Sequence, residues 1–444
     1  MSLLVKNGYV MTLDDANSVV RKGAIYIEND KIVEVGPTTE LEKKYTGVDK
    51  TIDANGRVVM PGMICGHMHF YSAFATGMPL DPFPPGFVSV LENLWWKIDK
   101  ALLKEDVYYS AMLGYLQAIK SGTTTVIDHH ASPSFVGGSL DVIEDVARKV
   151  GVRSNLCYEI TNRNSDEEAE EGLEENRRFV EKCQRRPDDL VSGLVGIHAS
   201  FTVSEEIMAK VGEVVANLDT GVHIHVAEGK ADMEHARKEF NSTVVERLGR
   251  HKLLNPKSIL AHCIHIEDVD YALLKESQAN IVTQPRSNMN NAVGALDIWK
   301  LQEHGIPFGL GTDGMSSDMR AELIVGNLIH KHIRQDNTVG TMEMYNALFQ
   351  QNPEIVRRVA GVETGALSPG KKADILVTNY YPKSPINPNN VVGHVLFGTV
   401  HEPISTTIVD GRVLMENSHL LVVDEAEVAE KCYDLAQQVW ARVN

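Results

Sequence analysis

The stretch VVMPGMICGHMH, residues 58–69, is an apolar run that ends in two histidines, His67 and His69. In an extended strand alternate side chains share a face, so both imidazoles point the same way and can converge on one metal ion. Such a pair is weak by itself, because chance pairs are common among 17 histidines. It predicts a metal site if further ligands follow at other strand ends, and otherwise two polar residues that close a strand.

The composition indicates one large globular core. The chain has 444 residues, of which 43% are hydrophobic, enough for a barrel with an accessory domain. The net charge of −17, without a block of basic residues, argues against nucleic acid or a membrane as a partner. The chain shows no signal peptide and no apolar stretch of the roughly 18 residues that span a bilayer, so we expect a cytoplasmic protein. The five cysteines form no C-x-x-C pair and are expected to be reduced thiols.

Short apolar strands alternate with amphipathic helices from about residue 58, a pattern typical of parallel βα units. Eight strands fit the closed (β/α)₈ TIM barrel of the α/β class, in which catalytic groups collect where strands end. Helices are expected between most strands, for example over 106–120 and 203–218. The expected barrel strands are 59–65, 123–128, 152–158, 192–197, 222–226, 258–261, 280–283 and 307–311.

Both ends of the chain predict short antiparallel strands instead, with turns at Asn29-Asp30 and Asp410-Gly411. Each end alone has too few strands to bury a core, so we expect the two to pack as one composite β-sandwich beside the barrel. The expected strands are 3–12, 23–27, 32–35, 373–378, 405–409 and 413–415. The expected domains are 1–58 plus 366–424 for the sandwich, 59–365 for the barrel and 425–444 for a terminal helix.

Histidines and acids stand at four further predicted strand ends, at His198, His225, His262 and Asp313. Three imidazoles and a carboxylate suit zinc or iron(II) in a catalytic site that keeps a position open for water. Such an ion lowers the pKa of bound water towards about 7 and so supplies hydroxide at neutral pH. The predicted metal ligands are His67, His69, His225 and Asp313.

Two more residues at the barrel mouth are suited to acid–base chemistry. Glu228 lies three residues beyond His225, where it can donate and accept protons at a substrate nitrogen. His262 is placed to orient the hydroxide or the carbon that it attacks. Roles of this kind typically contribute about 10²–10⁴-fold each, so both residues are predicted to be catalytic.

Several motifs along the chain match a known family. They are Met60-Pro61-Gly62 before His67-x-His69, then His223-x-His225-x-x-Glu228, Ala261-His262-Cys263 and Leu310-Gly311-Thr312-Asp313-Gly314. With them the chain resembles the amidohydrolase superfamily of the cytosine deaminase and chlorohydrolase type, over essentially its whole length. Within that superfamily it is similar to the SsnA-type aminohydrolases, on the stretches LWWKID (94–99), VIDHHASP (126–133) and RSNMNN (286–291).

The resemblance implies roles for individual residues. His67, His69, His225 and Asp313 would hold the metal, Glu228 would shuttle a proton, His262 would assist the hydroxide and His198 would contact the substrate. Asp313 would also take a proton from the metal-bound water. No lysine on the fourth strand is available to bridge two metals, which implies one divalent ion per chain, with zinc favoured and iron as the alternative. We expect a homo-oligomer, a dimer or larger, that acts on a small molecule.

Some residues keep two interpretations. One of His129 and His130 lines the pocket, with His130 taken as the contact, or both belong to an ordinary loop. Trp95 forms an aromatic wall for a flat ring, or it and Trp96 pack between helices. Asn288 contacts the substrate, or it stabilises its loop.

Two further kinds of residue are interpreted as structural. His223 is expected to be a buried, hydrogen-bonded histidine rather than a ligand, because it lies one layer deeper than His225 on the same face. Cys65 and Cys263 are expected to be small core residues.

The predicted reaction is hydrolytic deamination of an N-heterocycle of the purine or pyrimidine kind, with release of ammonia. Purines are the first expectation, from the breadth of the family. One alternative is chlorohydrolysis, or other C–X hydrolysis, at triazine-like rings. Another is a non-catalytic scaffold, which the joint presence of ligands and proton shuttle argues against.

Overall fold

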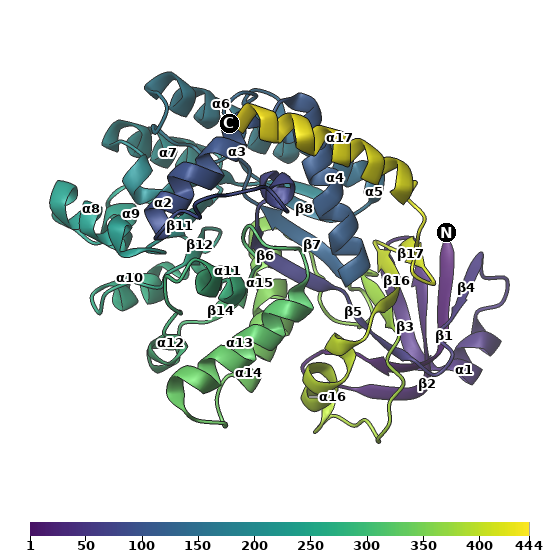
Figure 1. The fold of residues 1–444 in the computed structure, drawn as a ribbon. Coiled ribbons are helices and arrows are strands. Elements are labelled where there is room, and N and C mark those ends of the chain that lie inside the picture. Colours follow the sequence, from purple (N-terminus) through teal and green to yellow (C-terminus); the bar gives the residue numbers. More distant parts are fainter. Residues whose placement is uncertain (444) are drawn as a thin grey trace.

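The computed structural model describes residues 1–443 and contains the predicted (β/α)₈ barrel beside a large sheet (Figure 1). The barrel strands are parallel, and Met68 and Asp313 form the bridge that joins the last strand to the first. The fourth position is shared by two segments, β9 and β10, separated at Leu194. The strands are β6 (Met63–Met68), β7 (Thr123–Asp128), β8 (Arg153–Leu156), β9 (Val191–Gly193), β10 (Val195–Ala199), β11 (Val222–Val226), β12 (Ile259–His262), β13 (Asn280–Thr283) and β14 (Phe308–Leu310).

The first predicted barrel strand, residues 59–65, is wrong at its start, because the run contains two strands. β5 (Val58–Pro61) pairs with strands of the neighbouring sheet, and the barrel begins only with β6. Gly62 marks the change of sheet, since a Cβ there would lie 2.1 Å from Oγ1 of Thr124. Both strands are fully buried, so hydropathy alone does not separate them.

Within residues 1–443, the two ends of the chain build one mixed sheet of nine strands in the order β18-β17-β16-β15-β5-β1-β2-β3, with β4 beside β1. A bridge between Lys31 and Lys372 brings its edge back to the C-terminal segment, so the sheet curls around its own apolar core. The predicted joining of the two ends is confirmed. The strands are β1 (Ser2–Met11), β2 (Val19–Glu28), β3 (Lys31–Pro37), β4 (Lys50–Asp53), β15 (Ile375–Thr378), β16 (Ile404–Val409), β17 (Arg412–Glu416) and β18 (His419–Leu420).

Helices cover the outside of the barrel, and α17 runs across α3 and α4 towards it from the sheet (Figure 1). Many begin at a cap, as where Oγ of Ser204 accepts the amide of Ile207. Within residues 1–443, each helix is too short or too polar to cross a membrane. The longer helices are α4 (Lys104–Ser121), α5 (Ser139–Val150), α6 (Asp166–Arg185), α7 (Glu205–Asn217), α8 (Lys230–Phe240), α10 (Asp270–Ser277), α13 (Met319–Arg334), α15 (Asn352–Ala360) and α17 (Glu425–Val443). The shorter helices are α1 (Thr38–Lys44), α2 (Phe87–Val90), α3 (Trp96–Ala101), α9 (Val244–Arg250), α11 (Pro285–Asn290), α12 (Ile298–His304), α14 (Thr341–Asn346) and α16 (Val391–Phe397).

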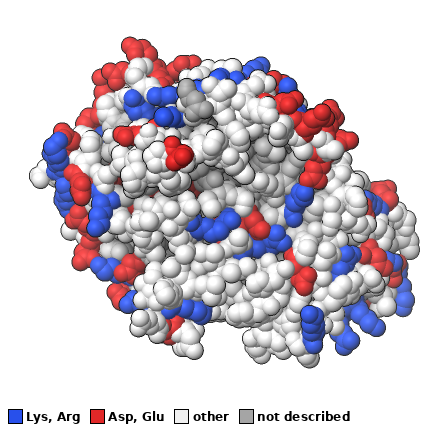
Figure 2. Space-filling view, in the orientation of Figure 1, with Lys and Arg blue, Asp and Glu red and all other residues white. Residues whose placement is uncertain are grey.

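Charges on the face of Figure 1 are mixed. Figure 2 shows acidic and basic side chains interspersed over this face, with acidic ones gathered along parts of its upper edge. Inside, one buried cation joins the barrel to the sheet. Arg153 of β8 is 2% exposed and pairs with Asp374, which is 1% exposed, and with Asp410. The ion pairs therefore couple the position of the sheet to a barrel strand.

Gly311, just after β14, should not tolerate even a methyl group. A Cβ there would lie 2.7 Å from both the backbone N and O of His67, atoms that cannot move without shifting a predicted metal ligand. We expect Gly311→Ala to reduce the free energy of unfolding by about 1–3 kcal/mol and to reduce bound zinc. Urea unfolding and metal analysis measure both effects. The matched control is Gly393→Ala in α16, where nothing lies within 4 Å and we expect an unchanged or slightly higher stability.

Candidate active site

Four side chains converge at the carboxyl ends of the barrel strands. His67 and His69 extend from β6, His225 from β11, and Asp313 follows β14. Nε2 of His69 lies 3.1 Å from Nε2 of His225 and 2.9 Å from Oδ1 of Asp313. Nε2 of His67 lies 3.4 Å from the same Oδ1. Ligand atoms around tetrahedral zinc are about 3.3 Å apart when the bonds are 2.0–2.1 Å, so these spacings match one metal ion.

The proton positions support the same conclusion. Nδ1 of His69 donates to the carbonyl of His129 at 2.6 Å, and Nδ1 of His225 donates to that of His198 at 2.7 Å. Both Nε2 atoms therefore carry lone pairs, and they face each other at 3.1 Å. Nε2 of His67 is buried without a hydrogen-bond partner among residues 1–443. Lone pairs that converge in this way repel unless a cation lies between them, and the donor set fits a divalent metal.

His223 supports the site from below, as predicted. It is fully buried, and its Nε2 lies 2.8 Å from Nδ1 of His67. With the proton on Nδ1, His67 donates to His223 and keeps its own Nε2 free for a metal. Nδ1 of His223 in turn lies 3.6 Å from Sγ of Cys157. The predicted role of His223 as a hydrogen-bonded structural residue is confirmed.

The backbone turns sharply where three of the strands end. Ala227 has φ of 48°, His262 of 73° and Asp313 of 56°, all in the left-handed region that non-glycine residues rarely adopt. Such conformations are held by the surrounding structure and cluster at functional sites. Here they let Glu228, His262 and Asp313 turn from the strand direction into the barrel mouth.

Glu228 and His262 form the second part of the site. Oε2 of Glu228 lies 3.4 Å from Nε2 of His262, and its Oε1 accepts from Asn291 at 3.1 Å. Burial, with the nearby charge of Asp313, raises the pKa of Glu228 to about 8. Nδ1 of His262 lies 2.9 Å from Oδ1 of Asn288, which fixes the ring and leaves Nε2 facing Glu228. A buried carboxyl that is protonated at neutral pH can donate a proton.

Asp313 remains ionised in this environment. Burial by itself would raise its pKa, but the contacts with His67 and His69 hold the pKa well below its usual range. Oγ of Ser287 donates to Oδ2, so Oδ1 is left to the histidines. The same Ser287 accepts from Asn291 at 3.4 Å, which connects Asp313 to Glu228 through two side chains.

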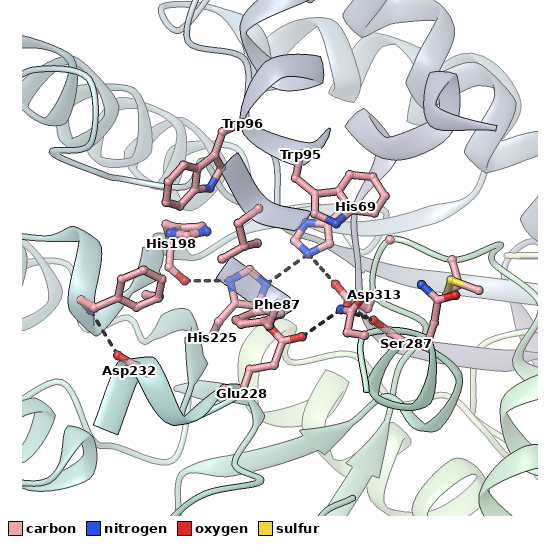
Figure 3. Close-up of a pocket in the computed structure, with 18 of the residues that line it drawn as sticks. His69, Phe87, Trp95, Trp96, His198, His225, Glu228, Asp232, Ser287 and Asp313 are labelled. Carbon is pink, nitrogen blue, oxygen red and sulfur yellow. Dashed lines mark hydrogen bonds and ion pairs between the residues drawn. The ribbon is translucent and has the colours of Figure 1, made fainter. Parts of the chain in front are cut away.

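A pocket opens above these groups, with aromatic walls (Figure 3). Trp95 and Trp96 both line it, with Tyr71, Phe87 and Phe201. His198 also lines the pocket, where burial lowers its pKa to about 3 and keeps the ring neutral. A flat heterocycle stacks well on walls of this kind.

The other two predicted substrate contacts lie behind the pocket wall. His130 is fully buried, and its Nε2 lies 2.9 Å from Oγ of Ser132. Asn288 is 1% exposed and faces His262. Contact with substrate stays a prediction for both, and the structure gives Asn288 a clear part in holding His262.

Sequence reasoning missed three groups near the site. Ser287 and Asn291 lie in the quoted stretch 286–291, but nothing in their spacing indicates bonds to Asp313 and Glu228. Glu159 is 1% exposed, with Oε1 3.2 Å from Nδ1 of His69. Burial opposes its ionisation, yet His69 and the other histidines lower its pKa to about 2. It ends the third predicted strand, so the strand-end rule applied there would have found it.

Comparisons with known proteins agree with this geometry. Residues 58–414 match the Amidohydrolase family. The 5'-deoxyadenosine deaminase of Methanosarcina mazei is 31% identical over 451 residues, covering 100% of this chain and 99% of that protein. The 5-methylthioadenosine/S-adenosylhomocysteine deaminase of Syntrophomonas wolfei is 29% identical over 448 residues, with 99% of each chain covered. An adenosine deaminase structure from Xanthomonas campestris with bound zinc has a TM-score of 0.86 at 20% identity, covering 99% of this chain and 98% of that one.

Proposed function

Because this chain belongs to the amidohydrolase family, we propose that it hydrolytically deaminates an N-heterocyclic amine, with adenosine-type nucleosides as the first substrates to test. The observation that carries the proposal is one pocket that combines converging metal donors with a protonated, buried Glu228. Two relatives of nearly full-length similarity are named as deaminases of adenine nucleosides. The aromatic walls of the pocket suit a purine ring.

His67, His69, His225 and Asp313 would hold the metal, for which we propose zinc. A divalent ion at such a site lowers the pKa of a water ligand towards about 7, which makes hydroxide available at neutral pH. Asp313, ionised and only partly used by Ser287, is placed to accept a proton released there. The second carboxylate oxygen is what lets one residue ligate and accept a proton.

Glu228 would supply the proton that a ring nitrogen needs. It is neutral below pH 8, lines the pocket, and is held by Asn291. Protonation of the ring nitrogen makes the adjacent carbon more electrophilic, and the same proton can later pass to the leaving amine. His262, held by Asn288, would keep the attacking oxygen and Glu228 in register.

The pH dependence of turnover should reflect the proton on Glu228. The raised pKa of about 8 means that the protonated donor predominates below pH 8 and is lost above it. We expect kcat for deamination to fall as pH rises through about 8, by about tenfold per unit well above the pKa. Steady-state kinetics between pH 6 and 10 test this. A kcat that keeps rising to pH 10 would show that protonated Glu228 is not required.

A screen with two readouts tests the proposed function. The zinc-loaded protein is incubated with adenosine, 5'-deoxyadenosine, 5'-methylthioadenosine, guanine, cytosine, a pterin and a chlorotriazine, and ammonia and chloride are both measured. We expect ammonia in equal amount to an inosine-type product from a 5'-modified adenosine. Chloride from the triazine without ammonia from any amine would support the chlorohydrolase instead. Stoichiometric zinc with neither product would favour the scaffold.

Two further expectations remain proposals alongside this one. They are the assembly of a homo-oligomer and a cytoplasmic location.

A further inference from the structure

His129 is a buried histidine without a structural explanation. It directly follows β7, is fully buried, and neither of its ring nitrogens has a hydrogen-bond partner among residues 1–443. An imidazole always has one N–H donor and one acceptor when neutral, so both are left unsatisfied. Each unsatisfied buried group costs about 1–3 kcal/mol, and a missing ion is one of the usual reasons for such a group.

The ring lies among the metal donors. Its centroid is 4.8 Å from that of His225, 5.6 Å from His69 and 5.8 Å from His67. One ligand atom from each of these four histidines can be chosen so that all lie within 4.8 Å of one another. His129 also stacks on His223, with centroids 4.4 Å apart, and so approaches the donors from the side of His223.

Glu159 is placed to orient His129. Oε1 of Glu159 lies 3.5 Å from Nδ1 of His129, and Glu159 is 1% exposed. Ligand histidines commonly donate their second ring N–H to a carboxylate, which directs the other nitrogen at the metal. A proton on Nδ1 of His129, directed at Glu159, would leave Nε2 with a free lone pair. Glu159 also adds a buried negative charge that a divalent cation would balance.

We propose that His129, oriented by Glu159, is a further metal ligand that completes a four-imidazole set with His67, His69 and His225. The ion then has two overlapping ligand sets, one that uses Asp313 and one that uses His129. The four-imidazole set holds the ion when the carboxylate of Asp313 is not a ligand. This inference rests on the metal site of the proposed function.

Zinc binding by a set of single and double variants tests the inference without any turnover assay. We expect Asp313→Asn to retain bound zinc after dialysis, because four imidazoles remain. His129→Gln should weaken zinc affinity by roughly 10–100-fold, and His129→Gln with Asp313→Asn should lose the metal on dialysis. His330→Gln is the matched control, since His330 is also buried, with an unpartnered Nδ1, but lies outside the donor cluster in α13. It should bind zinc like the unaltered protein.

X-ray absorption of zinc-loaded Asp313→Asn gives a direct count of imidazole ligands, and we expect four. Glu159→Gln in the Asp313→Asn background should weaken zinc binding in the same direction as His129→Gln, which serves if the latter does not fold. Three imidazoles in Asp313→Asn, or unchanged zinc affinity in both His129→Gln and Glu159→Gln, would overturn the inference. If these metal results hold while no amine releases ammonia, the proposed function fails and the inference stands. The reverse outcome separates them equally well.

Discussion

Glu228→Gln is expected to lower kcat for deamination by about 10²–10⁴-fold while zinc content stays unchanged. The substitution keeps the size of the side chain and the bond from Asn291, but removes the proton that Glu228 carries at neutral pH. Glu228 lies outside the converging donors of His67, His69, His225 and Asp313, so metal binding should not depend on it. Initial rates and metal analysis on the same preparation measure both quantities.

The control for this prediction is Glu239→Gln, the same chemical change on α8, where the carboxylate is exposed and pairs only with Lys238. It should leave turnover unchanged. The fall of kcat above pH 8 should also be absent in Glu228→Gln. Full turnover by a folded, zinc-loaded Glu228→Gln protein would contradict the proposed proton transfer.

Arg153→Met is expected to reduce the free energy of unfolding by roughly 3–5 kcal/mol. Methionine fills similar space, but it leaves the buried carboxylate of Asp374 and that of Asp410 without their cation. Removing one partner of a buried ion pair is costly because the remaining charge stays desolvated. Equilibrium unfolding in urea, followed by circular dichroism, measures the loss.

Arg148→Met provides the matched control, because Arg148 is 41% exposed and its ion pairs with Glu144 and Asp188 lie at the surface. Exposed pairs contribute about 0–1 kcal/mol each, so we expect a small change. Adding Asp374→Asn to Arg153→Met should recover part of the loss, since it removes one unpaired buried charge. Equal losses from Arg153→Met and Arg148→Met would show that burial of the ion pairs is not what stabilises the junction.

Much of the fold could be predicted because its signals are local. Alternation of strands and helices identified the barrel, and turn signals identified the sheet strands of both ends. The change of sheet at Gly62 was missed because β5 and β6 are equally apolar. The division of the fourth strand at Leu194 was missed for a similar reason, since its residues are apolar on both sides of the break.

The sequence by itself determined which residues stand at the mouth of the barrel. Alternating side chains put His67 and His69 on one face, and parallel strands bring their carboxyl ends to one rim, so His225 and Asp313 could be named without coordinates. Only the tertiary structure decided how the rim residues meet. Nε2 atoms from β6 and β11 are 3.1 Å apart, and His129 and Glu159 lie against them, because the ring of strands closes. Closure sets distances between residues far apart in the chain, and no local pattern contains that information.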